Sequence, residues 1–216
     1  MSLTLHFHPL SSFCQKVLVA LYENRTPFER NIVDLADPAQ RDALLALWPI
    51  GKFPVLVDAA RGETIAESTI IIEYLAIHHP GTTQLVPADA DLALATRLRD
   101  RFFDLYVDMP MQAIVGDRRR PAGAKDPHGV DEARRRLRTA YDMIEKDMAT
   151  RTWATGETFS MADCAAAPAL YYANLVEPFG EGHANVARYF ERLMARPSFA
   201  RAVKEAGPYR HLFPQE

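Results

Sequence analysis

The segment Trp48-Pro49-Ile50-Gly51-Lys52-Phe53-Pro54-Val55-Leu56-Val57-Asp58 decides the fold, because Pro54 opens an apolar run of strand-forming residues. Proline lacks a backbone N–H and is confined in sheets to the first residue of a strand or to an edge. A cis Phe53–Pro54 bond would turn the N–H and C=O of Phe53 outward, where an extended, peptide-like ligand can pair with them. The alternative is an ordinary trans bond, since only about 5–6% of X–Pro bonds in folded proteins are cis.

The residues on both sides of this segment alternate between strand and helix patterns. Leu3 to His8 alternates apolar and polar residues with period two and stops at Pro9, which predicts a strand. Apolar residues from Cys14 to Leu21 recur at helical spacing. The remaining predictions are a strand over 28–33, a helix over 38–47, a hairpin of 55–58 and 64–66, and a helix over 67–78. This order is compatible with a mixed sheet covered by helices.

The pattern changes after residue 79. The stretch from His79 to Pro87 is rich in turn-forming residues, so 80–87 is predicted to link an α/β domain (1–79) to a second domain (88–216). The second domain is predicted to be all-α, with residues 116–129 as an exposed loop. Its predicted helices cover 89–114, 130–150, 161–177, 185–196 and 198–206.

Composition excludes several classes of protein. The 216 residues are 48% hydrophobic, enough for a core in one or two domains. The net charge of −3 argues against a general nucleic-acid or acidic-membrane binder. Two cysteines cannot form a disulfide framework, and no secretory leader or membrane-span pattern is present, so a cytoplasmic location is expected. Arginine far outnumbers lysine and alanine is frequent, which suggests a bacterial source. No metal-ligand spacing and no glycine-rich phosphate motif occurs.

Two serines lie between the first predicted strand and helix. Ser11 is placed at the helix N-terminus, which carries partial positive charge and favours an anion. A hydroxyl there can donate a hydrogen bond to the thiolate of a bound thiol, or it can simply cap the helix. Cys14 completes the spacing of a redox Cys-x-x-Cys motif whose first sulfur is replaced by a hydroxyl. The alternatives for Cys14 are a reactive thiol or an inert, buried one, and Cys164 is predicted to be core.

Glu67-Ser68 occupy another junction between a strand and a helix. Ser68 and the N–H groups behind it can hold a ligand carboxylate, and Glu67 can pair with an ammonium group, which together suit a free amino-acid end. The alternative is an acidic first turn stabilised by the helix dipole. Ser160 and Asp163 have the spacing of a capping box and are interpreted as structural.

In combination, Ser11-x-x-Cys14, Phe53-Pro54 and Glu67-Ser68 resemble the cytosolic glutathione S-transferase superfamily over essentially the whole chain. The resemblance implies a thioredoxin-like N-terminal domain, a helical C-terminal domain and glutathione as co-substrate, without a metal. It also implies a homodimer.

The resemblance assigns roles to individual residues. Ser11 matches the hydroxyl that activates the glutathione thiol, although a shift of one residue in the turn would bring Ser12 forward instead. Pro54 matches the cis-proline, and Phe53 pairs through its backbone with the cysteinyl part of glutathione. Glu67 and Ser68 match the pair that binds the γ-glutamyl end, and Lys52 is a further candidate contact.

The resulting hypothesis is a transferase that ionises the glutathione thiol beside Ser11, without a general base on the protein, and adds it to an electrophilic small molecule. Serine rather than cysteine at this position favours conjugation, as in detoxification, or isomerisation over thiol–disulfide exchange. A zeta-like isomerase is disfavoured, because Phe13-Cys14-Gln15-Lys16-Val17 replaces its Trp-Arg-Val stretch. Phe102, Phe103, Tyr106 and Met109 offer apolar surface beside the electrophile, and the alternative for most of them is ordinary core.

Two rival functions stay open at this point. A glutathione-dependent disulfide reductase would need an exposed Cys14. A non-catalytic adaptor would keep the fold and bind a protein partner, but it has no need of all three motifs.

Overall fold

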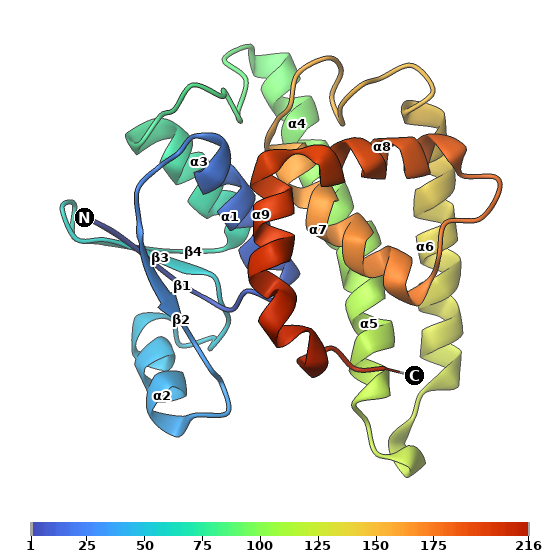
Figure 1. Ribbon diagram of the computed structural model, residues 1–216, viewed down its shortest axis with the longest axis horizontal. Helices are drawn as coiled ribbons and strands as arrows, with labels where there is room; N and C mark the ends of the chain where they lie inside the picture. The colour runs from blue at the N-terminus through green and yellow to red at the C-terminus, as the bar shows by residue number, and fades with distance from the viewer. Residues whose placement is uncertain (1, 216) are drawn as a thin grey trace.

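The computed structural model describes residues 2–215 as an α/β half followed by a helical half (Figure 1). The elements of the first half are β1 (Leu3–Phe7), α1 (Ser12–Glu23), β2 (Glu29–Ile32), α2 (Pro38–Leu47), β3 (Val55–Asp58), β4 (Glu63–Ala66) and α3 (Ser68–His78). These bounds confirm every strand and helix predicted for this half, to within two residues at each end.

The four strands form a mixed sheet in the order β2-β1-β3-β4. Strand β1 runs parallel to β2 and antiparallel to β3, so that Leu5 lies opposite Arg30 on one side and Leu56 on the other. Strands β3 and β4 form the predicted antiparallel hairpin. The period-two pattern of β1 fits its surroundings, because Leu3, Leu5 and Phe7 are buried.

The two faces of the sheet are covered by different helices. Successive residues of a strand point to opposite faces, and the neighbours Val55 and Leu56 illustrate this. Val55 packs with Leu44 of α2 in a small cluster, whereas Leu56 belongs to the main core. That main core includes residues of α1 and α3 and continues into the helical half. Helix α1 therefore lies against both halves of the molecule.

The second half contains only helices among its described residues. Its elements are α4 (Ala90–Phe102), η1 (Phe103–Asp108), α5 (Met109–Arg118), η2 (Ala122–Ala124), α6 (Pro127–Asp147), α7 (Met161–Val176), α8 (Ala184–Ala195), α9 (Pro197–Ala206) and η3 (Gly207–Leu212). All five predicted helices are present, whereas η2 and η3 were not predicted. Within the described chain, no helix has both the length and the apolar character needed to cross a membrane.

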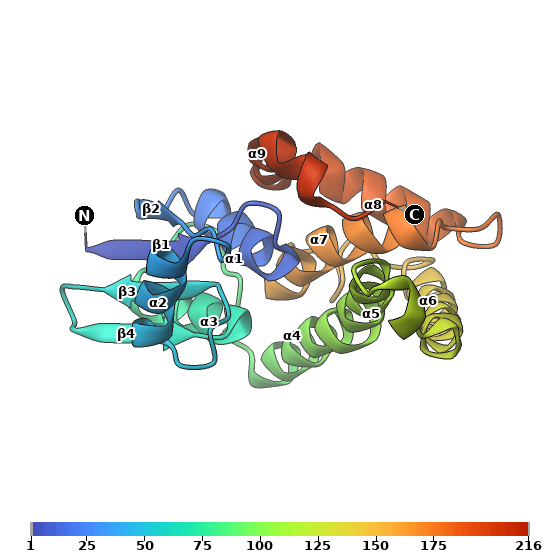
Figure 2. The ribbon, with the colours of Figure 1, turned by 90° about the horizontal axis from the view of Figure 1, so that it is seen from below.

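Helix α7 lies in the middle of this half, flanked by α8 and α9 on one side and by α4 and α5 on the other (Figure 2). Its N-terminus carries the predicted capping box: Asp163 accepts hydrogen bonds from the backbone N–H and the hydroxyl of Ser160. Asp163 also accepts a hydrogen bond from the Tyr189 hydroxyl at 2.6 Å. The structural interpretation of Ser160 and Asp163 is therefore confirmed.

The long helix predicted over 89–114 is interrupted by one π-helical segment, η1. Pro110 explains the interruption, because it has no N–H for a bond to the carbonyl four residues earlier and its ring would clash with that carbonyl. A wider turn accommodates both effects. The π turn shifts the helical register, so residues before and after it do not share the face that simple periodicity predicts.

Candidate functional site

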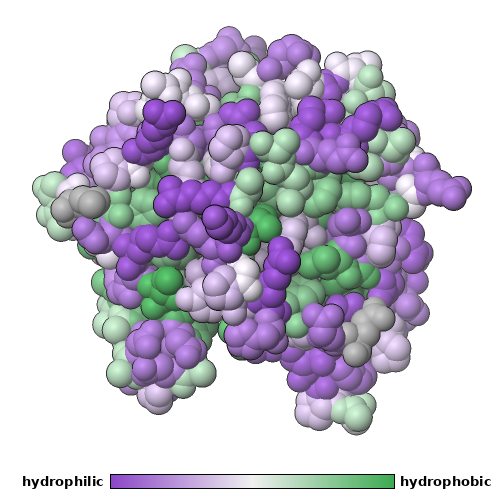
Figure 3. All heavy atoms as spheres, in the orientation of Figure 1, coloured by the Kyte–Doolittle hydropathy of each residue, from purple (hydrophilic) through white to green (hydrophobic). Residues whose placement is uncertain are grey.

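Five residues predicted to bind one ligand line a single cavity of about 210 Å³, here called the cis-proline cavity. They are Lys52, Phe53, Pro54, Glu67 and Ser68. The Phe53–Pro54 peptide bond is cis, as the resemblance implied, rather than the trans alternative. Figure 3 shows a notch at the lower edge of the molecule, between the lobe of α2 and the end of α5 and α6. The residues that line the cavity follow α2, begin α3 or lie on α1, α4, η1 and α5, so they come from both halves.

The α/β wall of the cavity is built by the two predicted motifs. The His8 ring stacks on Phe53, with centroids 6.2 Å apart, and holds the residue before the proline in place. Glu67 is exposed and has a φ of +67°, in the left-handed region that residues other than glycine rarely adopt. Such conformations concentrate at ligand sites. Ser68 is the first residue of α3 and is 5% exposed, so its hydroxyl lies beside unsatisfied N–H groups.

The opposite wall of the cavity comes from the helical half. It includes Met109, which the sequence analysis named, and Arg101 and Asp104, which it missed. A signal for Asp104 was present, because Asp100, Asp104 and Asp108 recur every four residues in a stretch whose other residues, apart from Arg101, are apolar. That spacing places carboxylates near one face of a helix.

Beneath this wall lies a buried ion network. The Lys16 ammonium is 1% exposed and lies 2.7 Å from Asp100 Oδ1 and 2.8 Å from Asp104 Oδ2. It also donates to Thr69 Oγ1 at 2.9 Å, and the Arg101 guanidinium contacts both carboxylates from outside. Burial raises the pKa of Asp104, and the Lys16 ammonium opposes that rise. The network joins α1, α3 and the two segments that form the opposite wall.

Ser11 and Ser12 line a second pocket of about 360 Å³, here called the serine pocket. Ser11 caps α1 by accepting a hydrogen bond from the Cys14 N–H at 3.4 Å. This leaves the Ser11 hydroxyl proton to be donated, so capping and thiolate stabilisation are compatible. The Ser12 hydroxyl instead donates to Asp108 Oδ2 at 3.2 Å. Both serines therefore reach the pocket, with opposite hydrogen-bonding roles.

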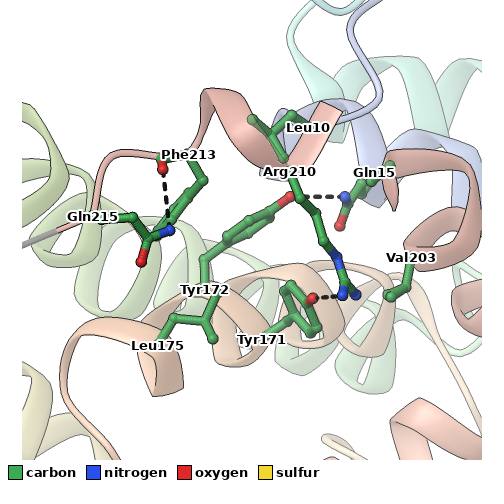
Figure 4. Close-up of a pocket in the computed structure, with 10 residues that line it drawn as sticks. Leu10, Gln15, Tyr171, Tyr172, Leu175, Val203, Arg210, Phe213 and Gln215 are labelled. Carbon is green, nitrogen blue, oxygen red and sulfur yellow. Dashed lines mark hydrogen bonds between the residues drawn. The ribbon is translucent and has the colours of Figure 1, made fainter. Parts of the chain in front are cut away.

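The serine pocket adjoins a third cavity of about 190 Å³, shown in Figure 4. The two share Leu10, Tyr172 and Phe213 as walls. In the third cavity the Gln15 amide donates to the Tyr172 hydroxyl at 3.0 Å, and Arg210 donates to the Tyr171 hydroxyl at 2.9 Å (Figure 4). The segment from Leu212 to Pro214 thus closes one side of the serine pocket.

The residues predicted beside the electrophile are not gathered at Ser11. Phe102 and Phe103 are only 6% and 2% exposed and belong to the core. Tyr106 is exposed, but it lines a groove of about 500 Å³ between η1 and α6. Only Met109 lines the cis-proline cavity. The core alternative is therefore confirmed for Phe102 and Phe103, whereas Tyr106 follows the π turn toward α6.

Both cysteines are buried in the core. Cys14 is 0% exposed, and burial raises the pKa of its thiol to about 12. The inert alternative is therefore confirmed, and the exposure that a disulfide reductase would need is absent. Cys164 is also 0% exposed and is core, as predicted. Across residues 2–215, no group of three His, Cys, Asp or Glu side chains is placed to hold a metal ion.

Comparison with known families gives two matches on this chain. Residues 5–83 match the glutathione S-transferase N-terminal domain, and residues 102–197 match the C-terminal domain. The chain belongs to the glutathione S-transferase family. Glutathione S-transferase 3 of Zea mays is 31% identical over 214 residues, covering 93% of each chain. FtsZ-localized protein A of Caulobacter vibrioides is 30% identical over 216 residues, covering 95% of this chain and 92% of its own.

Among solved glutathione S-transferases, that of Methylobacillus flagellatus with glutathione bound superimposes with a TM-score of 0.86. It is 29% identical, and the match covers 93% of this chain and 98% of the other. The thioredoxin-like N-terminal domain and the helical C-terminal domain expected from the sequence are thereby confirmed.

Proposed function

We propose that this glutathione S-transferase binds reduced glutathione, ionises its thiol beside Ser11 and adds the thiolate to an electrophilic small molecule. One observation carries the proposal: residues from four separate segments line one cavity, and one of them, Phe13, lies in the first turn of α1. The solved relative from Methylobacillus flagellatus, which has glutathione bound, supports the same ligand.

The cis-proline cavity offers complementary groups for each part of glutathione. The backbone of Phe53 would pair with the cysteinyl part, as an added strand pairs with a sheet edge. Glu67 would take the γ-glutamyl ammonium, and Ser68 with the N-terminus of α3 would take the carboxylate beside it. Lys52, on the rim, would contact a further carboxylate of the tripeptide.

Thiolate formation would depend on Ser11 and on the N-terminus of α1. Lowering the pKa of a thiol by about 2 units requires about 2.7 kcal/mol of preference for the thiolate. A hydrogen bond to a charged group contributes about 1.5–3 kcal/mol, and a helix terminus adds about 0.3–1 kcal/mol. The Ser11 hydroxyl and the helix terminus are together sufficient. The electrophile would occupy the serine pocket, between these groups and the segment from Leu212 to Pro214.

We also propose that the protein is a homodimer. Large apolar side chains on α3 and α4 are exposed, including Ile77, Leu94 and Leu98. An ion pair between Arg97 and Glu73 connects the two helices. An exposed apolar surface of this kind suits a homodimer.

We propose that residues 80–87 link domains 1–79 and 88–216, and that the enzyme detoxifies electrophiles in a bacterial cytoplasm.

Ultraviolet titration of the thiolate in the glutathione complex tests this function. In the wild type the pKa of the bound thiol is expected to lie about 2 units below that of free glutathione. In Ser11→Ala it should return most of the way to the free value. An unshifted thiol pKa in the wild-type complex would refute the proposal. An unchanged low pKa in Ser11→Ala would transfer the activating role from Ser11 to Ser12.

A second candidate is a non-catalytic adaptor that binds a protein partner. The similarity to FtsZ-localized protein A, a relative named for its localisation, favours it. Retention on immobilised glutathione discriminates between the two, because an adaptor has no need of the cis-proline cavity.

A further inference from the structure

Asp108 is a buried carboxylate directly behind Ser12. Its side chain belongs to the π segment η1 and is 2% exposed. Oδ2 accepts hydrogen bonds from the Ser12 hydroxyl at 3.2 Å and from the Gln112 amide at 2.6 Å. Oδ1 is buried and has no hydrogen-bond partner among the described residues. A buried carboxylate with an unpartnered oxygen is costly to keep ionised, so this one is poised to accept a proton.

The charged groups near Asp108 do not neutralise it. Lys16 on α1 attracts Asp108, but Asp100 of α4 and Asp104 of η1 share its ammonium. The charge of Asp104 also repels Asp108. Tyr172 faces Asp108 from α7 as a neutral hydroxyl, and from α5 the amide of Gln112 is the contact. Burial raises the pKa of Asp108 to about 7, although the bonds from Ser12 and Gln112 oppose the rise. The pKa of such a carboxyl is closer to the pKa of a thiol than that of an ordinary aspartate is, which favours proton transfer between them.

Ser12 connects this carboxylate to the proposed position of the thiol. Its side chain lines the serine pocket together with Ser11 and Gln112. Because its hydroxyl proton is directed at Asp108, its oxygen is left to accept a proton from the pocket side. Ser11 shows the opposite arrangement, since its oxygen accepts from the Cys14 N–H and its proton can be donated. One serine is thus oriented to receive the thiol proton and the other to stabilise the thiolate.

We propose that Asp108 takes the thiol proton of bound glutathione by way of Ser12. The S–H bond breaks as its proton passes to Ser12 Oγ, and the former Ser12 proton passes to Asp108 Oδ2. The electron pair of the broken bond stays on sulfur, so the products are a thiolate and a neutral carboxylic acid. This inference rests on the proposed function and supplies the general base that the sequence did not indicate. Asp108 acts through Ser12 and is a positioning residue rather than one that touches the thiol.

If Asp108 keeps the proton, the thiolate forms without releasing a proton to solvent. A purely structural role for Asp108 would not change the number of protons released. Calorimetric titrations with glutathione in buffers of different ionisation enthalpy count the protons released per molecule bound. Ultraviolet absorbance counts the thiolate formed in the same complex. S-methylglutathione, which has no thiol, gives the protons that other groups release, and this value is subtracted.

The thiolate formed beside Asp108 is a like charge, so it raises the pKa of this carboxyl above the value of the free protein. At about pH 8 Asp108 is ionised before binding, free glutathione is mostly a thiol, and the thiolate–carboxyl pair retains one proton. We therefore expect close to zero protons per thiolate in the wild type. Asp108→Asn and Ser12→Ala should each release about one proton per thiolate, because the relay is broken. Ser11→Ala is the matched control: it should lower the amount of thiolate and leave the ratio near zero. The wild-type ratio tests the proposal even if a variant fails to fold.

A wild-type ratio of about one would overturn the role of Asp108 and leave the proposed function intact. Glutathione bound entirely as the neutral thiol would overturn the proposed function and this inference together.

Discussion

Replacing Lys16 by methionine tests the buried network under the site. The change keeps most of the side-chain volume but removes an ammonium that is 1% exposed and contacts two carboxylates, at 2.7 Å and 2.8 Å. Asp100 is 0% and Asp104 is 4% exposed, so neither can be hydrated without local opening. Breaking a buried ion pair by removing one partner costs about 3–5 kcal/mol, because it leaves an uncompensated charge.

The lower end of that range applies here. Arg101 also contacts both aspartates and will compensate in part, but its side chain is 47% exposed and solvent weakens the attraction. We therefore expect Lys16→Met to lower the free energy of unfolding by about 3 kcal/mol near pH 7. Losing the ammonium also raises the pKa of Asp104 further, so the folded variant binds a proton more tightly and the deficit shrinks as pH falls.

Urea denaturation at about pH 7 and about pH 5 measures both effects. Lys204→Met serves as the control, because Lys204 is exposed on α9 and surface substitutions stay within about 0.5 kcal/mol. A Lys16→Met deficit below about 1 kcal/mol, or one that grows as pH falls, would refute the reasoning about the network.

Two further predictions follow from buried ionisable groups. The pKa of Asp108 is raised from 3.8 to about 7, so this residue contributes stability that is complete below about pH 4 and lost as pH rises through about 7. In urea denaturation, the wild type should therefore lose up to about 4 kcal/mol relative to Asp108→Asn between about pH 4 and pH 8. Parallel pH profiles of the two proteins would contradict this. Cys14 and Cys164 should resist thiol reagents in the native protein and react fully in guanidinium chloride, and rapid native labelling of Cys14 would contradict its burial.

The sequence was sufficient to predict elements whose signals are local. Period-two alternation predicted β1, and the proline at the start of α2 helped to predict that helix between Pro38 and Leu47. The resemblance to the family assigned Phe53 and Glu67 to one ligand, and both residues line one cavity.

The sequence was insufficient where the site depends on contacts between halves. Ser12 and Asp108 are 96 residues apart, and no local pattern pairs them. The π turn at η1 also could not be predicted from periodicity, and Tyr106, one of four candidates near the electrophile, lines a groove beside α6. One extra residue per turn rotates everything beyond it by about 100°, so small errors in helix geometry become errors in which side chains face a ligand.

Calorimetric binding of glutathione to the wild type and to Glu67→Gln tests the central claim most directly. We predict saturable binding by the wild type and a loss of about ten- to a hundredfold in affinity in the variant, because a hydrogen bond to a charged group contributes about 1.5–3 kcal/mol. Glu63→Gln, an exposed glutamate on neighbouring β4, should bind like the wild type. Absence of binding by the wild type, or equal affinity in Glu67→Gln, would contradict the assignment of the cis-proline cavity to glutathione.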